Sequence, residues 1–406
     1  MQSNRKYVAL ASATIAFAVS FAAWSLLSPL ATQLQTEYHI SDIQISVLIA
    51  IPVILGSIAR IPMGVLTDRF GGRRVMTALL LFCVVPCLGL LSAANYTAFV
   101  IWAFVLGMAG SSFAIGIPFV SRWFGPEQQG LVAGIFGMGN IGTAVSARLA
   151  PQIAKNTGWH TVFLVFAVVL FVTAVAFYFV AQDAPLPPGP TKTMAQRLSI
   201  LKENRLVWLF SLFYFVTFGC FVAFGLYLPK LLTDLYKLDK IDAGNRTAIF
   251  VVCATLARPV GGWLSDRLGA SRVLTATFAV VLLAALILTF QTQVIILTSC
   301  FLIAAVFLGM GSGAVFKLVP QYFAKDAGTV TGLVGAAGGL GGFFPPLIMG
   351  AVKSTSGNYS VGYLLLALTS GVCLILLIKV LNKPQAPRQG SIQQMGSPAQ
   401  SGLGVK

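Results

Sequence analysis

The chain has 406 residues, of which 57% are hydrophobic and only 9% are charged. Soluble domains carry roughly 25% charged residues, so this composition excludes a soluble enzyme and indicates a membrane protein. The formal net charge of +16 does not require a nucleic acid partner, because the cationic loops of a membrane protein lie against anionic lipid headgroups.

Apolar stretches of about twenty residues, separated by polar breaks, predict twelve transmembrane helices. In chain order they cover residues 7–31, 43–66, 75–94, 99–120, 131–151, 161–181, 206–228, 248–264, 273–290, 294–317, 330–352 and 361–381. The polar segment 182–205 is expected to be a cytoplasmic linker between an N-terminal half, residues 1–181, and a C-terminal half, residues 206–381. The tail, residues 382–406, is rich in Pro, Gln, Ser and Gly, which predicts disorder.

The distribution of basic residues between the loops predicts the orientation. Loops after even-numbered spans hold Arg69, Arg73, Arg74, Lys192, Arg197, Lys202, Arg205, Arg267, Arg272 and Lys325. The positive-inside rule therefore places both termini in the cytoplasm. One loop on the other side, residues 230–246, breaks the pattern with Lys230, Lys237, Lys240 and Arg246. Because that loop also holds three aspartates, we interpret it as a mixed-charge exception.

One arginine lies inside the second apolar span and another inside the eighth. Residues 59–74 read ARIPMGVLTDRFGGRR, and residues 257–272, which begin 198 positions later, read ARPVGGWLSDRLGASR. The two halves are therefore a duplication, and Arg60 corresponds to Arg258. A guanidinium at membrane depth costs at least about 2.5–3.5 kcal/mol and is tolerated mainly beside a protein-lined cavity or a partner. Neither span contains an acidic residue, so the predicted partner is an anion.

Arg60 precedes the cytoplasmic motif by two helical turns, roughly 12 Å, which is deep for a side chain that snorkels to the interface. All eleven acidic residues fall in loops or at span ends, and both histidines, His39 and His160, lie on the predicted external side. Proton-coupled carriers commonly use titratable groups at membrane depth. Their absence here favours anion exchange, while coupling to protons remains an alternative.

All six cysteines lie in apolar spans, and none has a nearby His or acidic residue that could complete a metal site. Packing is the simpler interpretation. No nucleophile and base pattern appears either. We therefore expect no metal, no cofactor and no enzymatic activity.

Twelve spans in two related halves, with G-x-x-x-D-R-x-G-x-x-R after the second and eighth spans, resemble the major facilitator superfamily. The fold that this resemblance implies is an all-α membrane protein of two pseudo-symmetric six-helix bundles. It also implies gating and structural roles, and not substrate contacts, for the motif residues Asp68, Arg69, Arg74, Asp266, Arg267 and Arg272.

Two glycine-rich spans narrow the resemblance. Residues 130–142 read GLVAGIFGMGNIG and residues 328–342 read GTVTGLVGAAGGLGG. Gly134 and Gly332, like Gly137 and Gly335, keep the offset of 198 residues. One small-residue pattern often marks ordinary helix packing. Two at repeat-related positions, together with both arginines, resemble the paired signature segments of the nitrate/nitrite porter family.

By this resemblance, the anion lies near the midplane between Arg60 and Arg258, whose planar donor forks suit a flat trigonal oxyanion. Asn140 would add an amide donor and Tyr214 a hydroxyl, and the rings of Phe113 and Phe316 would sandwich the anion. Packing remains the alternative for the three aromatic residues, and an interhelical hydrogen bond for Asn140. Arg148 lies near the predicted external face and has no assigned role.

The expected function is secondary transport of nitrate and nitrite by alternating access, most simply as nitrate/nitrite exchange. The alternatives are proton-coupled nitrate symport and transport of small carboxylates such as formate or oxalate; a membrane anion sensor that does not transport is more remote. The expected location is the bacterial inner membrane, with membrane lipid as surroundings. We expect the protein to be a monomer.

Overall fold

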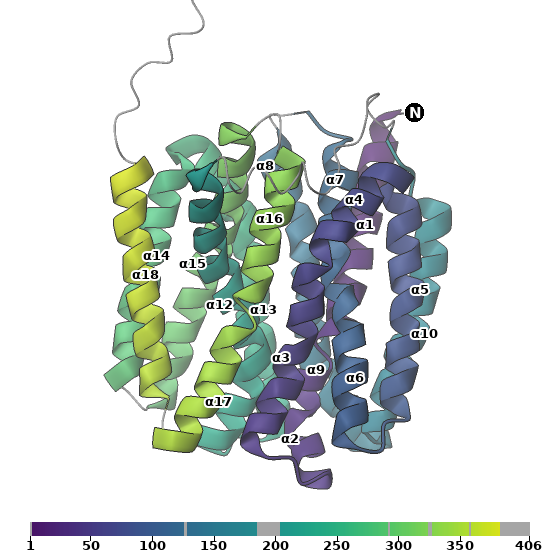
Figure 1. The fold of residues 1–406 in the computed structure, drawn as a ribbon, viewed down its shortest axis with the longest axis vertical. Helices are drawn as coiled ribbons and strands as arrows, with labels where there is room; N and C mark the ends of the chain where they lie inside the picture. The colour runs from purple at the N-terminus through teal and green to yellow at the C-terminus, as the bar shows by residue number, and fades with distance from the viewer. Residues whose placement is uncertain are drawn as a thin grey trace, which may run out of the picture.

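The computed structural model describes residues 2–125, 128–184, 204–290, 293–323, 327–356 and 359–381, and every regular element in these ranges is a helix. The first half contains α1 (Gln2–Trp24), α2 (Leu27–Glu37), α3 (Asp42–Ile58), α4 (Arg60–Phe70), α5 (Gly72–Leu91), α6 (Tyr96–Leu106), η1 (Gly107–Ser111), α7 (Ser112–Ser121), α8 (Gln129–Gly137), η3 (Met138–Asn140), α9 (Ile141–Thr157) and α10 (Trp159–Val180). The second half contains α12 (Arg205–Tyr236), α13 (Lys240–Leu268), α14 (Ala270–Phe290), α15 (Val294–Tyr322), α16 (Ala327–Leu340), α17 (Phe344–Ser356) and α18 (Ser360–Leu381). The two halves stand side by side as separate helical bundles (Figure 1). Most of the predicted linker and the whole predicted tail lie outside the described residues.

Eleven helical stretches of the described chain are long and apolar enough to cross a membrane, and each coincides with a predicted span. The remaining predicted span, residues 330–352, corresponds to α16 and α17, which lie end to end (Figure 1). The prediction of an all-helical membrane protein is therefore confirmed, and the first, second, fourth, fifth and eleventh predicted spans are each divided into shorter helices.

Three spans are broken three or four residues before a proline. The breaks fall at Ser25, four residues before Pro29, at Ala59, three residues before Pro62, and at Gly341, four residues before Pro345. A proline has no N–H to donate to the carbonyl four residues earlier, and its ring clashes with that carbonyl. The helix therefore ends there and begins again. In the second span the break places Arg60 at the first position of α4.

The outer surface of the two bundles carries large apolar side chains. Phe179 is 75% exposed, Phe290 79% and Ile295 76%. Water would disfavour this exposure, whereas lipid hydrocarbon solvates it, and continuous helices satisfy their own backbone groups there. The apolar perimeter and the helical backbone together identify a multi-pass membrane protein.

The glycine-rich segments lie at the interface between the halves, and each packs against the arginine helix of the opposite half. Helix α8 of the first half packs against α13, and α16 of the second half packs against α3 and α4. The approach is close, because a Cβ added at Gly134 would lie 3.0 Å from the Cα of Pro259. Each arginine therefore faces a helix that the other half supplies.

Candidate functional site

Both arginines are buried at the interface between the halves. Arg60 is 2% exposed and Arg258 is 4% exposed, and no carboxylate among the described residues forms an ion pair with either. The two guanidinium carbons lie 5.3 and 5.0 Å from the centroid of one ring, that of Phe218 on α12. A desolvated cation over an aromatic face gains about 2 kcal/mol. The two charges therefore contact the same ring, and we call the buried cluster of Arg60, Arg258 and Phe218 the arginine chamber.

Sequence reasoning missed Phe218, and also Phe221, whose ring lies 5.3 Å from the Arg258 guanidinium. Both are phenylalanines in an apolar span rich in them, so composition carries no signal that separates them from packing residues. Tyr214 lies one turn before Phe218, and the two rings stack at 4.9 Å with planes 7° apart. The run from Tyr214 to Phe221 thus forms an aromatic wall beside the arginines.

The guanidinium of Arg60 is hydrogen-bonded to backbone carbonyls from both halves. Its Nε donates to the carbonyl oxygen of Gly110 at 3.3 Å, and its Nη1 donates to the carbonyl oxygen of Gly335. Gly110 lies in the 3₁₀ turn η1, and Gly335 lies in α16 of the opposite half. Arg60 therefore links the two halves through hydrogen bonds to the backbone.

The guanidinium of Arg258 lacks hydrogen-bond partners for two donors, one of which, Nε, is bonded to a backbone carbonyl in Arg60. The two donors, Nε and Nη2, are buried. The hydroxyl of Tyr214 approaches Arg258 and lies near Arg60, but not with the geometry of a hydrogen bond. A buried donor without a partner costs about 1–3 kcal/mol, and more when the group is charged. No protein acceptor in the described chain satisfies these two donors of Arg258.

Asn140 lies in η3, one residue before α9, and is completely buried. Its Nδ2 donates one N–H to the carbonyl oxygen of Gly137 at 2.6 Å, and its Oδ1 has no partner. This bond runs within the same segment and does not join two helices. Gly137 itself faces Arg258, since a Cβ there would lie 3.2 Å from Nη1. The amide of Asn140 thus belongs to the segment that faces the second arginine.

Phe113 on α7 and Phe316 on α15 meet across the interface, with ring centroids 5.6 Å apart and planes tilted by 43°. Carbon atoms in contact lie about 3.5–4.0 Å apart, so rings on either side of a flat anion need nearly twice that spacing. The two rings contact each other directly in this state. The predicted sandwich would require the halves to separate slightly at this point.

The two repeated G-x-x-x-D-R-x-G-x-x-R motifs lie away from the arginine chamber. Asp266 forms an ion pair with Lys317 on α15 and lies beside the start of α8, since a Cβ at Gly130 would be 3.3 Å from Oδ2 of Asp266. A carboxylate is favourable at a helix N-terminus. The side chain of Asp68, its repeat partner, lies outside the described residues. A gating role for these residues stays a prediction.

The basic residues of the motifs sit at the surface. The guanidinium of Arg267 lies 4.3 Å from the ring centroid of Trp263, and that of Arg69 lies 5.1 Å from the ring of Phe70. Arg272 is exposed, and Arg74 lines a shallow cavity beside α4 and α5. None of them reaches the chamber, in agreement with a role other than substrate contact.

Helix α2 lies at the end of the bundle opposite the N-terminus (Figure 1), and a lysine of α12 ties it to the second half. Lys230 of α12 is 1% exposed, and its Nζ lies 3.2 Å from Oδ1 of Asp42, 3.0 Å from Oδ2 of Asp234 and 2.9 Å from Oε1 of Gln35. Asp42 and Gln35 belong to the first half. Sequence reasoning missed this cluster, because a lysine at the end of an apolar run is typical of an interfacial residue.

The interpretation of residues 230–246 as one external loop was wrong. Lys230 lies inside α12 and Arg246 inside α13, and only residues 237–239 connect the two helices. The length of an apolar run underestimates the length of a helix whose ends are polar but pack against the other half. Arg148 also joins the halves here, donating from Nη1 to Oδ1 of Asn245 at 2.9 Å, so its contact is structural.

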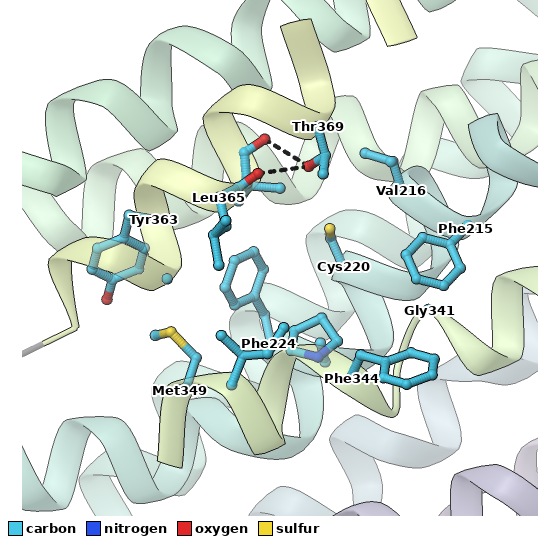
Figure 2. A pocket seen from close by; sticks show the side chains of 15 residues that line it. Phe215, Val216, Cys220, Phe224, Gly341, Phe344, Met349, Tyr363, Leu365 and Thr369 are labelled. Atoms are coloured by element: carbon cyan, nitrogen blue, oxygen red, sulfur yellow. Dashed lines mark hydrogen bonds between the residues drawn. The ribbon is translucent and has the colours of Figure 1, made fainter. Parts of the chain in front are cut away.

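An apolar cavity of about 160 Å³ lies elsewhere, between α12, α17 and α18, and Cys220, Phe224 and Met349 line it (Figure 2). Its Thr369 hydroxyl donates to the carbonyl oxygens of Leu365 and Leu366 in its own helix. This cavity offers no cation to an anion and is distinct from the arginine chamber.

Gly338→Ala is expected to lower anion affinity at least tenfold. A Cβ at this position would overlap the ring of Tyr214, which cannot move without displacing Phe218, and such overpacking costs typically about 1–3 kcal/mol. Gly332→Ala in the same helix is the matched control, because a Cβ there meets nothing within 4 Å. Nitrate titration of the purified variants measures the effect. Equal affinities in the two variants would contradict the assignment of Tyr214 to the chamber.

Two related helical bundles with buried, unpaired polar groups at their interface define a secondary transporter of the alternating-access type. The family model described as "Major Facilitator Superfamily" matches residues 13–245 and 231–405. The chain belongs to this superfamily, and its similarity over nearly its whole length to proteins named as nitrate or nitrite transporters places it in the nitrate/nitrite porter family.

Curated relatives agree over nearly the whole chain. The "Probable nitrate transporter NarT" of Staphylococcus epidermidis is 39% identical over 92% of this chain and 96% of its own length. The "Nitrite extrusion protein" of Bacillus subtilis is 39% identical over 92% and 94%. The "Probable nitrate/nitrite transporter NarK2" of Mycobacterium tuberculosis is 41% identical over 89% and 93%.

A solved bacterial homologue of the human lysosomal transporter Spinster, in an inward-facing and occupied conformation, is similar with a TM-score of 0.67 and 14% identity. The alignment covers 92% of this chain and 96% of that one. At this identity the likeness supports the fold alone, and that fold is the predicted pair of six-helix bundles.

Proposed function

We propose that the protein transports nitrate and nitrite across the bacterial inner membrane by alternating access, with the anion held between Arg60 and Arg258. The observation that carries the proposal is the pair of buried guanidinium groups on one aromatic ring, without a carboxylate partner among the residues that the structure describes. The printed names of the relatives support nitrate and nitrite as the anions. The protein acts as a monomer with both termini in the cytoplasm.

The unpaired donors suggest how the anion is recognised. Nε and Nη2 of Arg258 form the side edge of the guanidinium, a pair of parallel N–H groups that matches two oxygens of a trigonal oxyanion. The hydroxyl of Tyr214 can donate to the same anion. Formate offers a similar pair of oxygens, so competition between labelled nitrate and nitrite, formate or oxalate tests the choice of substrate.

The arrangement favours exchange over uniport. When the halves close without an anion, the Gly335 carbonyl satisfies Arg60, but two donors of Arg258 remain unpaired. Leaving charged donors unpaired in a buried site costs several kcal/mol, so an empty carrier closes rarely. A bound anion removes this cost and lets the halves rock in either direction.

Proteoliposomes loaded with nitrite are therefore expected to take up nitrate at least about tenfold faster than empty ones, because one buried unpaired donor alone costs about 1–3 kcal/mol. Labelled nitrate uptake together with a lumenal pH dye measures both fluxes. Equal uptake by loaded and empty vesicles, with lumenal acidification that follows nitrate, would refute exchange and favour proton symport. Liposomes without protein are the control.

A further inference from the structure

A cavity of about 690 Å³ lies between the halves and is lined in part by α2. Helix α2 lies at the end of the bundle opposite the N-terminus (Figure 1), which the predicted orientation makes external. Both halves line it, with Thr32 and Lys155 from the first and Thr233, Lys237 and Lys240 from the second. The hydroxyls of Thr32 and Thr233 lie 3.5 Å apart across the interface. The cavity is thus an outer vestibule above the closed contact between the halves, separate from the arginine chamber.

The vestibule is basic. Its lining contains Lys155, Lys237 and Lys240 and one carboxylate, Asp239. Oδ2 of Asp239 accepts a hydrogen bond from the backbone N–H of Ile241 and caps α13. Within the described ranges, none of the three lysines forms an ion pair. The side of the membrane that should be poor in lysine therefore carries an excess of positive charge at the interface between the halves.

Fold stability does not account for two of these lysines. Lys237 has φ +53°, a left-handed conformation that glycine adopts at least cost. Lys240 is the first residue of α13, where the helix dipole disfavours a cation. A residue that is unfavourable for its backbone conformation or for the helix dipole, and that gains no compensating contact nearby, marks a functional position more often than a structural one. The common property of the three positions is that they face the same vestibule.

We infer that this vestibule is an outer collecting site for small inorganic oxyanions, which raises their concentration at the mouth of the carrier. The identity of the anion rests on the proposed function. The positive potential of the vestibule rests only on the three lysines. A concave site lined by one sign of charge focuses its field and speeds the arrival of counter-ions. The anion stays hydrated in the vestibule until the contact between Thr32 and Thr233 opens.

The first test measures the local potential and requires no transport. Gln33 lines the vestibule and supplies a position for a reporter in Gln33→Cys. Its rate of reaction with an anionic methanethiosulfonate, divided by that with a cationic one, is expected to fall about tenfold when Lys155, Lys237 and Lys240 are all changed to Gln, and only at low ionic strength. The parent chain without the added cysteine corrects for the six native thiols. An unchanged ratio would overturn the inference.

The second test measures transport in membrane vesicles of known orientation. For external nitrate, the triple Lys→Gln variant is expected to lose about three- to tenfold in kcat/KM at 10 mM salt and to match the original protein at 0.5 M, because salt screens exposed charges. The triple Lys→Arg variant should behave like the original protein. A loss that persists at high salt would contradict the collecting site. Absence of nitrate uptake in every variant, with the thiol ratio as expected, would instead count against the proposed substrate.

Discussion

Arg258→Lys is expected to lower the affinity for nitrate by about 100-fold and to stop exchange. The variant keeps the charge but replaces the side edge of two N–H donors by a single ammonium, and a hydrogen bond to a charged group contributes about 1.5–3 kcal/mol. Nitrate titration of the purified protein gives the affinity, and exchange in nitrite-loaded proteoliposomes gives the rate. Wild-type affinity in this variant would show that Arg258 is not a ligand.

Arg60→Lys should also lose most transport, but with a smaller loss of affinity, about tenfold. The structure gives the reason, since two donors of Arg60 are already bonded to the carbonyls of Gly110 and Gly335 and must be released to serve the anion. Arg148→Lys is the control, because that guanidinium bonds to Asn245 far from the chamber. Equal losses in the Arg60 and Arg258 variants would contradict the asymmetry between the two arginines.

Lys230→Met is expected to open the halves at the end opposite the N-terminus. The carboxylates of Asp42 and Asp234 would lose their shared ammonium partner and repel each other. Removing one partner of a fully buried ion pair costs about 3–5 kcal/mol; because Asp42 is 43% exposed, water screens part of this, and about 1–2 kcal/mol is expected. Exchange should slow, because the closed state becomes harder to reach.

Spin labels at Thr36 of α2 and Leu235 of α12, both exposed, report this opening through the distance between them. In Lys230→Met the distribution should shift outward by several ångströms. Arg246→Met is the matched control, since Arg246 pairs with Asp242 one turn away in the same helix and ties nothing across the interface. An unchanged distribution in Lys230→Met would remove Lys230 from the gate.

Local sequence patterns were enough to predict the spans and the duplication. Apolar length located the helices, and the shared spacing of 198 residues identified Arg60 and Arg258 as related positions. Both signals are local or repeated, and neither requires knowledge of how the halves meet. Burial of both side chains followed from the cost of placing a guanidinium in lipid.

The features that depend on contact between the halves could not be predicted in this way. Phe218 is one of 30 phenylalanines, and only packing brings it between the two arginines. The same holds for Lys230, whose acidic partners lie about 190 residues earlier in one case and four residues later in the other. The two sequence repeats are similar and therefore do not predict that the two arginines form different hydrogen bonds. The difference depends on the 3₁₀ turn at Gly110.

The crossed packing of α8 on α13 and of α16 on α3 and α4 makes the two halves depend on each other. Each half holds one arginine, and the glycine-rich helix that packs against the helix of that arginine comes from the other half. Neither half expressed alone could therefore enclose its guanidinium. The two copies of the repeat are complementary parts of one site.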